Sequence, residues 1–283
     1  MQITQLLKIA SDQLESTSDS PLLDAQILLA HSLQKNRTWL VTWSDKHLIQ
    51  SEVDDFNRLL NRRLQGEPIA HITGTREFWS LDLQVSRDTL IPRPETELMV
   101  EQILQRYPQS TGMSLLDLGT GSGAIALALA SEHPGWNIVA TDKSTAALNI
   151  AKQNAQQLAL KNIHFIAGSW FEPLNDLSPD KRQFDIIASN PPYIPDTDPH
   201  LSQGDVRFEP LSALASGDDG LDDIRHICQQ ATAFLKSSGM LIIEHGFDQK
   251  SEIQAIFTDS GYINIEQIND LSGQPRLCIG IKP

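Results

Sequence analysis

The tetrapeptide Asn-Pro-Pro-Tyr at residues 190–193 carries the groups needed to hold a flat amino group. It directly follows residues 184–189, an apolar run that predicts a strand. Two consecutive prolines end a strand and supply carbonyl groups without competing N–H donors. The asparagine side chain adds a second carbonyl acceptor, and the tyrosine ring can form a wall for a planar group. We therefore predict that the catalytic and substrate-binding residues are Asn190, Pro191, Pro192 and Tyr193.

A glycine-rich turn earlier in the chain predicts a ligand-binding loop. Residues 119–123 read Gly-Thr-Gly-Ser-Gly between a predicted strand and a predicted helix, and glycines there let a ligand approach the backbone. Asp142 ends the next predicted strand, so a doubly wound sheet brings it to the same carboxyl edge. A carboxylate at that edge can accept both hydroxyls of a ribose. The predicted cofactor-binding residues are Asp117, Gly119, Thr120, Gly121, Ser122, Gly123 and Asp142.

Two ligand classes, dinucleotides and S-adenosylmethionine (SAM), fit such a turn. The dinucleotide fingerprint is GxGxxG, with a pyrophosphate at the helix N-terminus. This chain has GxGxG instead, and Asp117 stands just before it. A carboxylate there suits the amino and sulfonium groups of SAM and would repel a pyrophosphate, so we expect SAM as the cofactor.

The elements that must position these residues alternate along the chain. Strands separated by helices predict an α/β fold, a doubly wound parallel sheet with helices on both faces. Residues 194–220 lack periodicity and predict a long loop, which in a compact domain is often functional. The predicted strands are 114–118, 137–141, 163–167, 184–189, 240–245, 262–268 and 276–281, and the predicted helices are 94–106, 123–132, 144–158, 221–236 and 248–259.

The first part of the chain has a different pattern. Apolar residues recur there at helical spacing, and the pattern changes to alternation near Phe78. We predict a small all-α domain at residues 1–75, a β-hairpin linker at 76–93 and the doubly wound domain at 94–283.

Composition narrows the function classes. Lys and Arg number 22 against 36 Asp and Glu, so the formal net charge is −14, a poor balance for gripping a nucleic-acid backbone. Two distant cysteines form neither a disulfide framework nor a metal cluster, and the histidines lack HExxH-type spacing, so we predict no metal. The start lacks the pattern of a signal peptide, and the apolar runs are too short to span a membrane. We expect a soluble cytoplasmic protein.

Four further segments, added to the glycine turn and the Asn-Pro-Pro-Tyr motif, make nearly the whole chain resemble the PrmC/HemK family. They are Pro-Ile-Ala-His-Ile-Thr-Gly at 68–74, Leu-Ile-Pro-Arg-Pro-Glu-Thr-Glu at 90–97, Val-Arg-Phe-Glu-Pro at 206–210 and Ser-Gly-Asp-Asp-Gly-Leu at 216–221. Members of that family methylate the glutamine of the Gly-Gly-Gln motif in peptide chain release factors. The resemblance implies a class I SAM-dependent methyltransferase domain with a seven-stranded sheet whose last strand is antiparallel.

The resemblance also implies roles for individual residues. The glycine turn would line the methionine part of SAM, and Asp142 would hold the ribose. Ser169 and Trp170 follow the third strand, where the family contacts the adenine ring; the family often has an acidic residue at this serine, whose hydroxyl is a weaker acceptor. Asn190 would touch both the methyl donor and the target amide. Release factors would be the partner of a monomeric enzyme, docked by residues 1–75, with no stable nucleic acid or membrane contact.

Three rival functions share parts of this pattern. An adenine-N6 DNA methyltransferase also uses Asn-Pro-Pro-Tyr, but it must flip a base and grip a backbone, which the acidic charge disfavours. A glutamine methyltransferase acting on a ribosomal protein differs little in sequence. A SAM-binding module without catalysis is disfavoured because both motifs are intact.

Two further sets of polar residues could take part in the site or could only stabilise the fold. Glu244 and His245 end a predicted strand, and we expect them to support residues that touch a ligand or to be structural, because the sequence pairs them with no nucleophile. The residues Arg93, Glu95, Arg207 and Glu209 lie near the substrate loop in the family pattern, and they either bind substrate or form salt bridges within the loop.

Overall fold

The computed structural model describes residues 1–108, 110–176, 178 and 182–283, which form two compact units. The first unit comprises Met1–Thr75 together with Ser202–Phe208. The second comprises Arg76–Leu201 and Glu209–Pro283. The chain therefore leaves the second unit once, contributes a short segment to the first, and returns.

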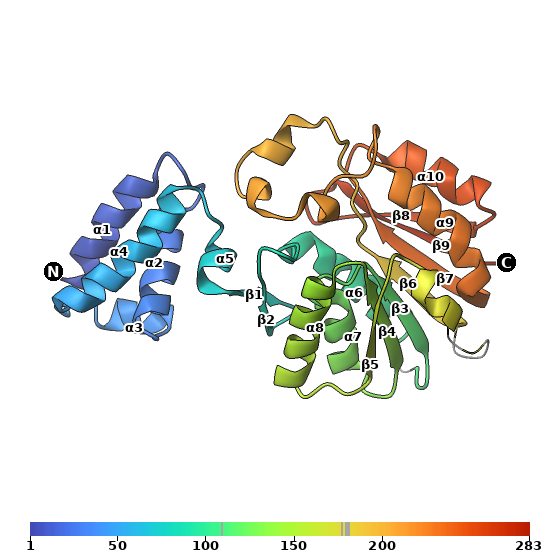
Figure 1. Ribbon diagram of the computed structural model, residues 1–283, viewed down its shortest axis with the longest axis horizontal. Coiled ribbons are helices and arrows are strands. Elements are labelled where there is room, and N and C mark those ends of the chain that lie inside the picture. The colour runs from blue at the N-terminus through green and yellow to red at the C-terminus, as the bar shows by residue number, and fades with distance from the viewer. Residues whose placement is uncertain (109, 177, 179–181) are drawn as a thin grey trace. The chain divides into compact units, whose positions relative to one another are not determined.

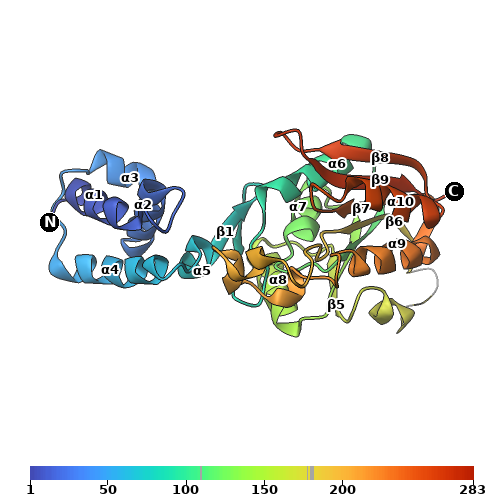
Figure 2. The same ribbon diagram turned by 90° about the horizontal axis from the view of Figure 1, so that it is seen from above.

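The first unit is a helical bundle, and Figure 2 shows α1, α2 and α3 on one side of α4. Pro21 begins α2 at a position where a proline costs no hydrogen bond, and the Asn36 side chain caps α3 by accepting from Trp39 N at 2.8 Å. The apolar faces close on a core that includes Ile3, Leu28 and Phe56. The helices are α1 (Ile3–Leu14), α2 (Pro21–Ser32), α3 (Arg37–Thr42), α4 (Gln50–Leu64) and α5 (Ile69–Thr73).

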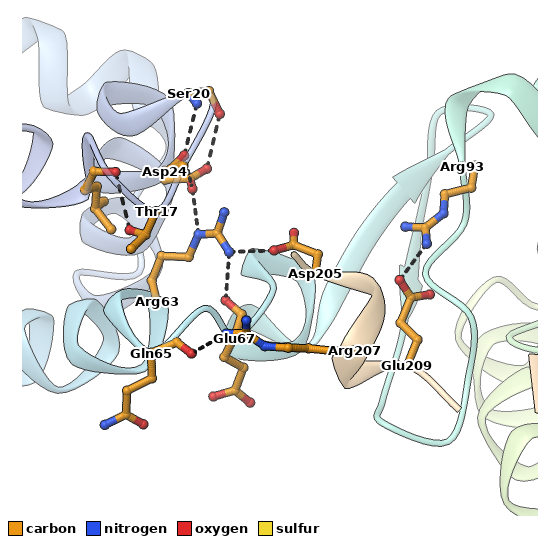
Figure 3. Close-up of polar contacts among 12 residues, drawn as sticks. Thr17, Ser20, Asp24, Arg63, Gln65, Glu67, Arg93, Asp205, Arg207 and Glu209 are labelled. Carbon is orange, nitrogen blue, oxygen red and sulfur yellow. Dashed lines mark hydrogen bonds and ion pairs between the residues drawn. The ribbon is translucent and has the colours of Figure 1, made fainter. Parts of the chain in front are cut away.

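A buried arginine on α4 joins the later segment to this bundle. Arg63 donates to a carboxylate oxygen of Asp24 at 2.8 Å and to one of Asp205 at 2.8 Å (Figure 3). Arg207 donates to the Gln65 carbonyl at 2.9 Å. Residues Ser202–Phe208 are thus held by side chains of the first unit, although they lie far away in sequence.

The second unit begins with a short hairpin, β1 (Thr75–Phe78) and β2 (Leu81–Gln84), as the alternation predicts. Trp79 and Ser80 between them have φ values of 52° and 59°, the left-handed pair that a tight two-residue hairpin turn requires. The 3-10 helix η1 (Pro94–Thr96) then leads into α6 (Glu97–Arg106).

A seven-stranded sheet forms the centre of this unit (Figure 1), with the order β5-β4-β3-β6-β7-β9-β8. Pairing is parallel from β5 to β7, whereas β9 runs antiparallel to both β7 and β8. The predicted doubly wound fold with an antiparallel last strand is therefore confirmed. The strands are β3 (Ser114–Leu118), β4 (Asn137–Asp142), β5 (Ile163–Ala167), β6 (Phe184–Ser189), β7 (Leu235–Glu244), β8 (Ile263–Asn269) and β9 (Pro275–Ile281).

Alternate strand residues enter two separate cores, one on each face of the sheet. Leu115 and Ile186 pack with α6, α7 and α8 on one face, whereas Leu116 and Ile187 pack with α9 and α10 on the other. Figure 1 shows the two helix layers on opposite sides of the strands. The covering helices are α7 (Ala124–Glu132), α8 (Thr145–Gln157), α9 (Asp222–Phe234) and α10 (Lys250–Asp259).

The structure differs from the predicted elements at two places. β7 begins at Leu235, five residues before the predicted start, and a bulge separates this residue from Met240 in the pairing with β6. Within the bulge Lys236 pairs with Asp185 at 2.7 Å. The predicted long loop contains three 3-10 helices, η4 (Pro199–Ser202), η5 (Val206–Phe208) and η6 (Leu211–Ala213). Among the described residues, every helix falls short of the length and apolar character needed to cross a membrane.

Candidate active site

A cavity of about 290 Å³ opens beside the carboxyl ends of β3, β4 and β6. The strand order reverses between β3 and β6, because β4 and β5 extend one way from β3 and β6 and β7 the other. Ligands of open α/β sheets bind at such a switch point. The predicted site residues that line the cavity are Gly119, Gly121, Asp142, Ser169, Trp170, Asn190 and Pro192.

The glycine turn needs glycine for conformation and for space. Gly119, Gly121 and Gly123 have φ values of 70°, 58° and 90°, which side chains rarely adopt. A Cβ on Gly119 would stand 3.3 Å from the ring of Trp170, whereas one on Gly121 would meet nothing within 4 Å. The turn therefore packs against Trp170 at one glycine and opens onto the cavity at the next.

Asp142 connects the turn to the second strand. Its Oδ2 accepts from the Gly121 N–H at 2.9 Å, and its Oδ1 accepts from the Ser144 N–H at 2.8 Å. Each carboxylate oxygen has more than one acceptor site, so these bonds fix the group and leave capacity for a ligand in the cavity.

Asp117, Thr120 and Ser122 do not line the described cavity. Their side chains are buried beneath the turn. Oδ2 of Asp117 accepts from the Thr120 hydroxyl at 2.6 Å and from the Ala126 N–H at 3.2 Å. The other oxygen, Oδ1, is buried without a hydrogen-bond partner among the described residues. Burial raises the pKa of this carboxyl to about 7, against the lowering effect of its two donors.

This raised pKa predicts how Asp117→Asn changes stability with pH. A carboxyl whose folded pKa lies above its unfolded value destabilises the fold progressively as pH rises from about 4 to about 7. The amide keeps an acceptor for both donors and carries no charge. We expect Asp117→Asn to stabilise the protein without ligand by on the order of 2 kcal/mol at pH 8 and to have little effect at pH 4. Urea unfolding at both pH values measures this, and an equal effect at each would contradict it.

Ser169 and Trp170 lie beyond β5, where the family resemblance expects the adenine contact. Trp170 has a left-handed φ of 48°, and its indole N–H donates to Asp223 Oδ1 at 3.1 Å. Asp223 also accepts from the Ser216 hydroxyl at 2.8 Å. The loop at 216–221 therefore helps to hold the indole against the glycine turn.

Asn190 stands next to the glycine turn because β3 and β6 are neighbours, with Leu118 opposite Ser189. Its Nδ2 donates to the Thr96 hydroxyl at 3.1 Å, so its amide is a donor as well as the predicted acceptor. Pro191 and Tyr193 are absent from the described lining of the cavity. Tyr193 is therefore not seen as the expected wall of this cavity, and its hydroxyl donates to Glu244 Oε1 at 3.5 Å.

Glu244 is a residue whose link to the site sequence reasoning did not identify, because the sequence placed it at a strand end without a partner. It ends β7 at 1% exposure and accepts from the Thr96 hydroxyl through Oε2 at 2.7 Å. Burial raises its pKa to about 7, although Thr96, Arg276 and Tyr193 lower it. An acidic residue directly after the apolar run 240–243 was the available signal, because that strand must end at the same edge as β6.

Further lining residues come from three segments whose roles the sequence did not reveal. The end of the linker and the start of α8 bring charged groups of both signs to the cavity, and the loop after Glu209 adds small residues. These are Arg87, Asp88, Thr89, Leu90, Lys143, Ser144, Ala147, Pro210, Ser212 and Ala213.

Arg93 and Glu209 form an ion pair, which is one of the two interpretations that the sequence left open. Arg93 donates to Glu209 Oε1 at 2.6 Å (Figure 3). The Ile91 N–H donates to Oε2 of the same carboxylate at 3.0 Å. The Glu209 side chain is fully buried. These bonds hold the loop that carries Pro210 and Ser212 against the linker that carries Arg87 to Leu90.

The chain is similar to known proteins along nearly its whole length. A family described as the PrmC N-terminal domain matches residues 5–74, and one described as a methyltransferase domain matches 109–274. The release factor glutamine methyltransferase of Aliivibrio fischeri is 50% identical over 99% of this chain and 97% of that protein. The chain belongs to the release factor glutamine methyltransferase family. The Escherichia coli K12 member is 47% identical over 99% of both chains.

Solved structures of more distant members of the fold agree with this class. A methyltransferase from Pyrococcus furiosus has a TM-score of 0.54 at 18% identity and covers 80% of this chain and 98% of its own. The T. thermophilus 16S rRNA N2 G1207 methyltransferase, solved with AdoMet and guanosine, has a TM-score of 0.53 at 19% identity over 74% of this chain and 50% of its own. The second unit of this family member therefore has the class I methyltransferase fold.

Proposed function

We propose that this protein transfers the methyl group of SAM to the side-chain amide nitrogen of the glutamine in the Gly-Gly-Gln motif of peptide chain release factors. The observation that carries the proposal is Asn190, which lines the same cavity as Gly119 and Asp142 at the switch point of the sheet. The relatives named above are called release factor glutamine methyltransferases, and each matches 99% of the chain, which supports the proposal.

The cavity fits SAM in its chemistry. Gly121 opens onto it with room for a ligand against the backbone, Asp142 offers charged acceptors, and Trp170 offers an aromatic face. Oδ1 of Asp117, which has no hydrogen-bond partner among the described residues, adds a buried acceptor beneath the turn and favours a cationic ligand over a pyrophosphate. SAM, when bound, supplies a methyl group on a sulfonium centre that is open to attack by a nucleophile.

The protein's own task is to activate and aim a weak nucleophile. An amide nitrogen reacts poorly because its lone pair is delocalised into the carbonyl. The Asn190 side-chain carbonyl and the Pro191 backbone carbonyl, placed against the two amide hydrogens, raise electron density on nitrogen and orient its lone pair. This is catalysis by orientation and preorganised dipoles. A strong base is unnecessary before transfer, because the proton becomes acidic once nitrogen is alkylated.

We also propose that residues 1–75 dock the release factor. The cavity residues all lie after position 86, so the first unit is free for another role. It exposes large apolar side chains, among them Val41, Trp43 and Ile49. Exposed apolar side chains that gather into one patch are typical of protein contact surfaces.

Asp142→Ala tests the cofactor part of the proposal. Removing the carboxylate deletes charge-assisted acceptors for the ribose and the anchor of the Gly121 N–H. We expect the affinity for SAM to fall by about 1.5–3 kcal/mol, roughly ten- to a hundredfold, in calorimetry. Asp259→Ala, an exposed aspartate at the end of α10, is the matched control and should bind SAM like the wild type. Unchanged affinity of Asp142→Ala would remove this residue from the site.

The substrate part is tested by incubating the protein with methyl-labelled SAM and cell extract, then identifying the labelled protein and residue by mass spectrometry. We expect label on a release factor glutamine. Label on a ribosomal protein would support the closest rival, and label on adenine in DNA would overturn the proposal.

A further inference from the structure

Three residues from three separate elements form a chain of hydrogen bonds that ends at the cavity. Glu244 ends β7, Thr96 ends η1 and Asn190 follows β6. Glu244 Oε2 and Thr96 Oγ1 are 2.7 Å apart, and Thr96 Oγ1 and Asn190 Nδ2 are 3.1 Å apart. Thr96 is 4% exposed and Glu244 1%, so the bond between them is shielded from water, whereas the bond from Asn190 to Thr96 is partly buried.

The protons of this chain can be placed by counting donors. A threonine hydroxyl has one hydrogen, and an ionised carboxylate has none. With Glu244 ionised, the Thr96 hydrogen must point to Glu244. The Thr96 oxygen then has only acceptor capacity left for Asn190, so the Asn190 NH₂ faces Thr96. The carbonyl oxygen of Asn190 is thereby left for the cavity.

We propose that Thr96 and Glu244 are positioning residues that lock the Asn190 amide with its carbonyl toward the substrate, so that a glutamine NH₂ meets an acceptor. This inference rests on the proposed function, because an acceptor is required only if the target offers hydrogens. Two amide groups facing each other through their NH₂ sides cannot bond. If the side-chain amide of Asn190 rotates by half a turn, its NH₂ group replaces its carbonyl oxygen at the substrate. The side chain then stays in the site but no longer acts as the acceptor.

Protonation of Glu244 reverses the direction of the hydrogen bonds that link Glu244, Thr96 and Asn190. A protonated carboxyl donates to Thr96, whose hydrogen is then free to donate to the oxygen of a rotated Asn190. The groups that face Glu244 are Thr96 and Glu95 from η1, Tyr193 from the loop after β6 and Arg276 from β9, with His245 next to it in the chain. Arg276 favours the ionised form and Glu95 disfavours it. The raised pKa of Glu244, about 7, places this change near neutral pH.

Kinetics at saturating SAM and release factor test the chain with four variants. Thr96→Val and Glu244→Leu each break the proton order, because one removes the hydroxyl and the other removes its acceptor, and we expect kcat to fall about tenfold, the effect of one buried hydrogen bond. The double variant should lose little more than either single one, because both act through Asn190. Thr96→Ser keeps the hydroxyl and should retain wild-type kcat. The affinity for SAM should change less than twofold in all four.

The pH profile separates positioning from a merely structural role. Wild-type kcat should fall as pH drops below about 7, because protonated Glu244 no longer orders the chain. Glu244→Gln should lack this acid limb, whereas Glu101→Gln, an exposed carboxylate on α6, should keep it. Wild-type kcat in Thr96→Val, an unchanged acid limb in Glu244→Gln, or a loss of SAM affinity as large as the loss of kcat would each overturn the inference.

A readout without turnover keeps this inference separate from the proposed function. The side-chain NH₂ signals of Asn190, assigned in ¹⁵N spectra of the full chain by comparison with Asn190→Ala, should shift with pH in the wild type. They should not titrate in Glu244→Gln. If the wild type fails to methylate glutamine but this titration is seen, the proposed function is wrong and the positioning chain stands. If methylation is seen and neither titration nor acid limb appears, the positioning chain is wrong.

Discussion

Asn190→Ala is expected to lower kcat for methyl transfer by about 10²–10³-fold while leaving the affinity for SAM within about twofold of the wild type. The side-chain carbonyl acts on the amide hydrogens most strongly as nitrogen becomes positive in the transition state, so its loss affects turnover more than binding. Single-turnover kinetics with methyl-labelled SAM and purified release factor measure the effect.

Asn190→Asp is the sharper companion to the alanine variant. It keeps two acceptor oxygens, but it has no N–H to give to Thr96, and it places a second carboxylate near Glu244. We expect activity close to that of Asn190→Ala, because donor and acceptor are both required. Asn269→Ala, an exposed asparagine at the end of β8, serves as the control and should be fully active. High activity of Asn190→Asp would show that acceptor geometry alone is sufficient.

Arg63→Met is expected to destabilise the first unit by about 3 kcal/mol. The guanidinium is 8% exposed and donates to Asp24, Asp205 and the Glu67 carbonyl. Its removal leaves the buried carboxylate of Asp24 with two serine hydroxyls as its side-chain donors among the described residues, and an uncompensated buried charge is costly. Calorimetric unfolding measures the loss.

The same variant tests the docking role of the first unit. At a temperature where the unit is unfolded in Arg63→Met, we expect a raised KM for intact release factor and unchanged affinity for SAM. Arg58→Met on the same helix is the matched control, because its ion pair with Asp55 is exposed and contributes about 0–1 kcal/mol. An unchanged KM in Arg63→Met with the unit unfolded would remove the first unit from substrate docking.

The strands and helices of the second unit were predictable because each carries its own local signal. Apolar runs such as 184–189 mark strands buried on both faces, and the glycine turn and the two prolines mark where strands end. The rule that carboxyl ends share one edge then placed Gly119, Asp142 and Asn190 around one cavity, as the structure has them.

The contacts around Asn190 could not be predicted in the same way. The bond between Thr96 and Glu244 joins residues 148 positions apart, and neither local sequence indicates the other residue as its partner. The orientation of Tyr193 depends on that buried carboxylate, so a motif that names the tyrosine does not show where its hydroxyl turns. The segment 202–208 likewise joins the first unit through Arg63, an arginine with no special sequence context.

The central claim is that the protein recognises and methylates a glutamine amide, and one comparison of substrates tests it most directly. Purified release factor and its Gly-Gly-Glu variant are each incubated with methyl-labelled SAM and the wild-type protein, and the modified residue is located by tandem mass spectrometry. A carboxylate has no hydrogens to donate to Asn190 or Pro191. We expect one methyl group on the amide nitrogen of the Gly-Gly-Gln glutamine and no label on the glutamate variant. Labelling of both factors at similar rates, or of another residue in the first, would contradict the account.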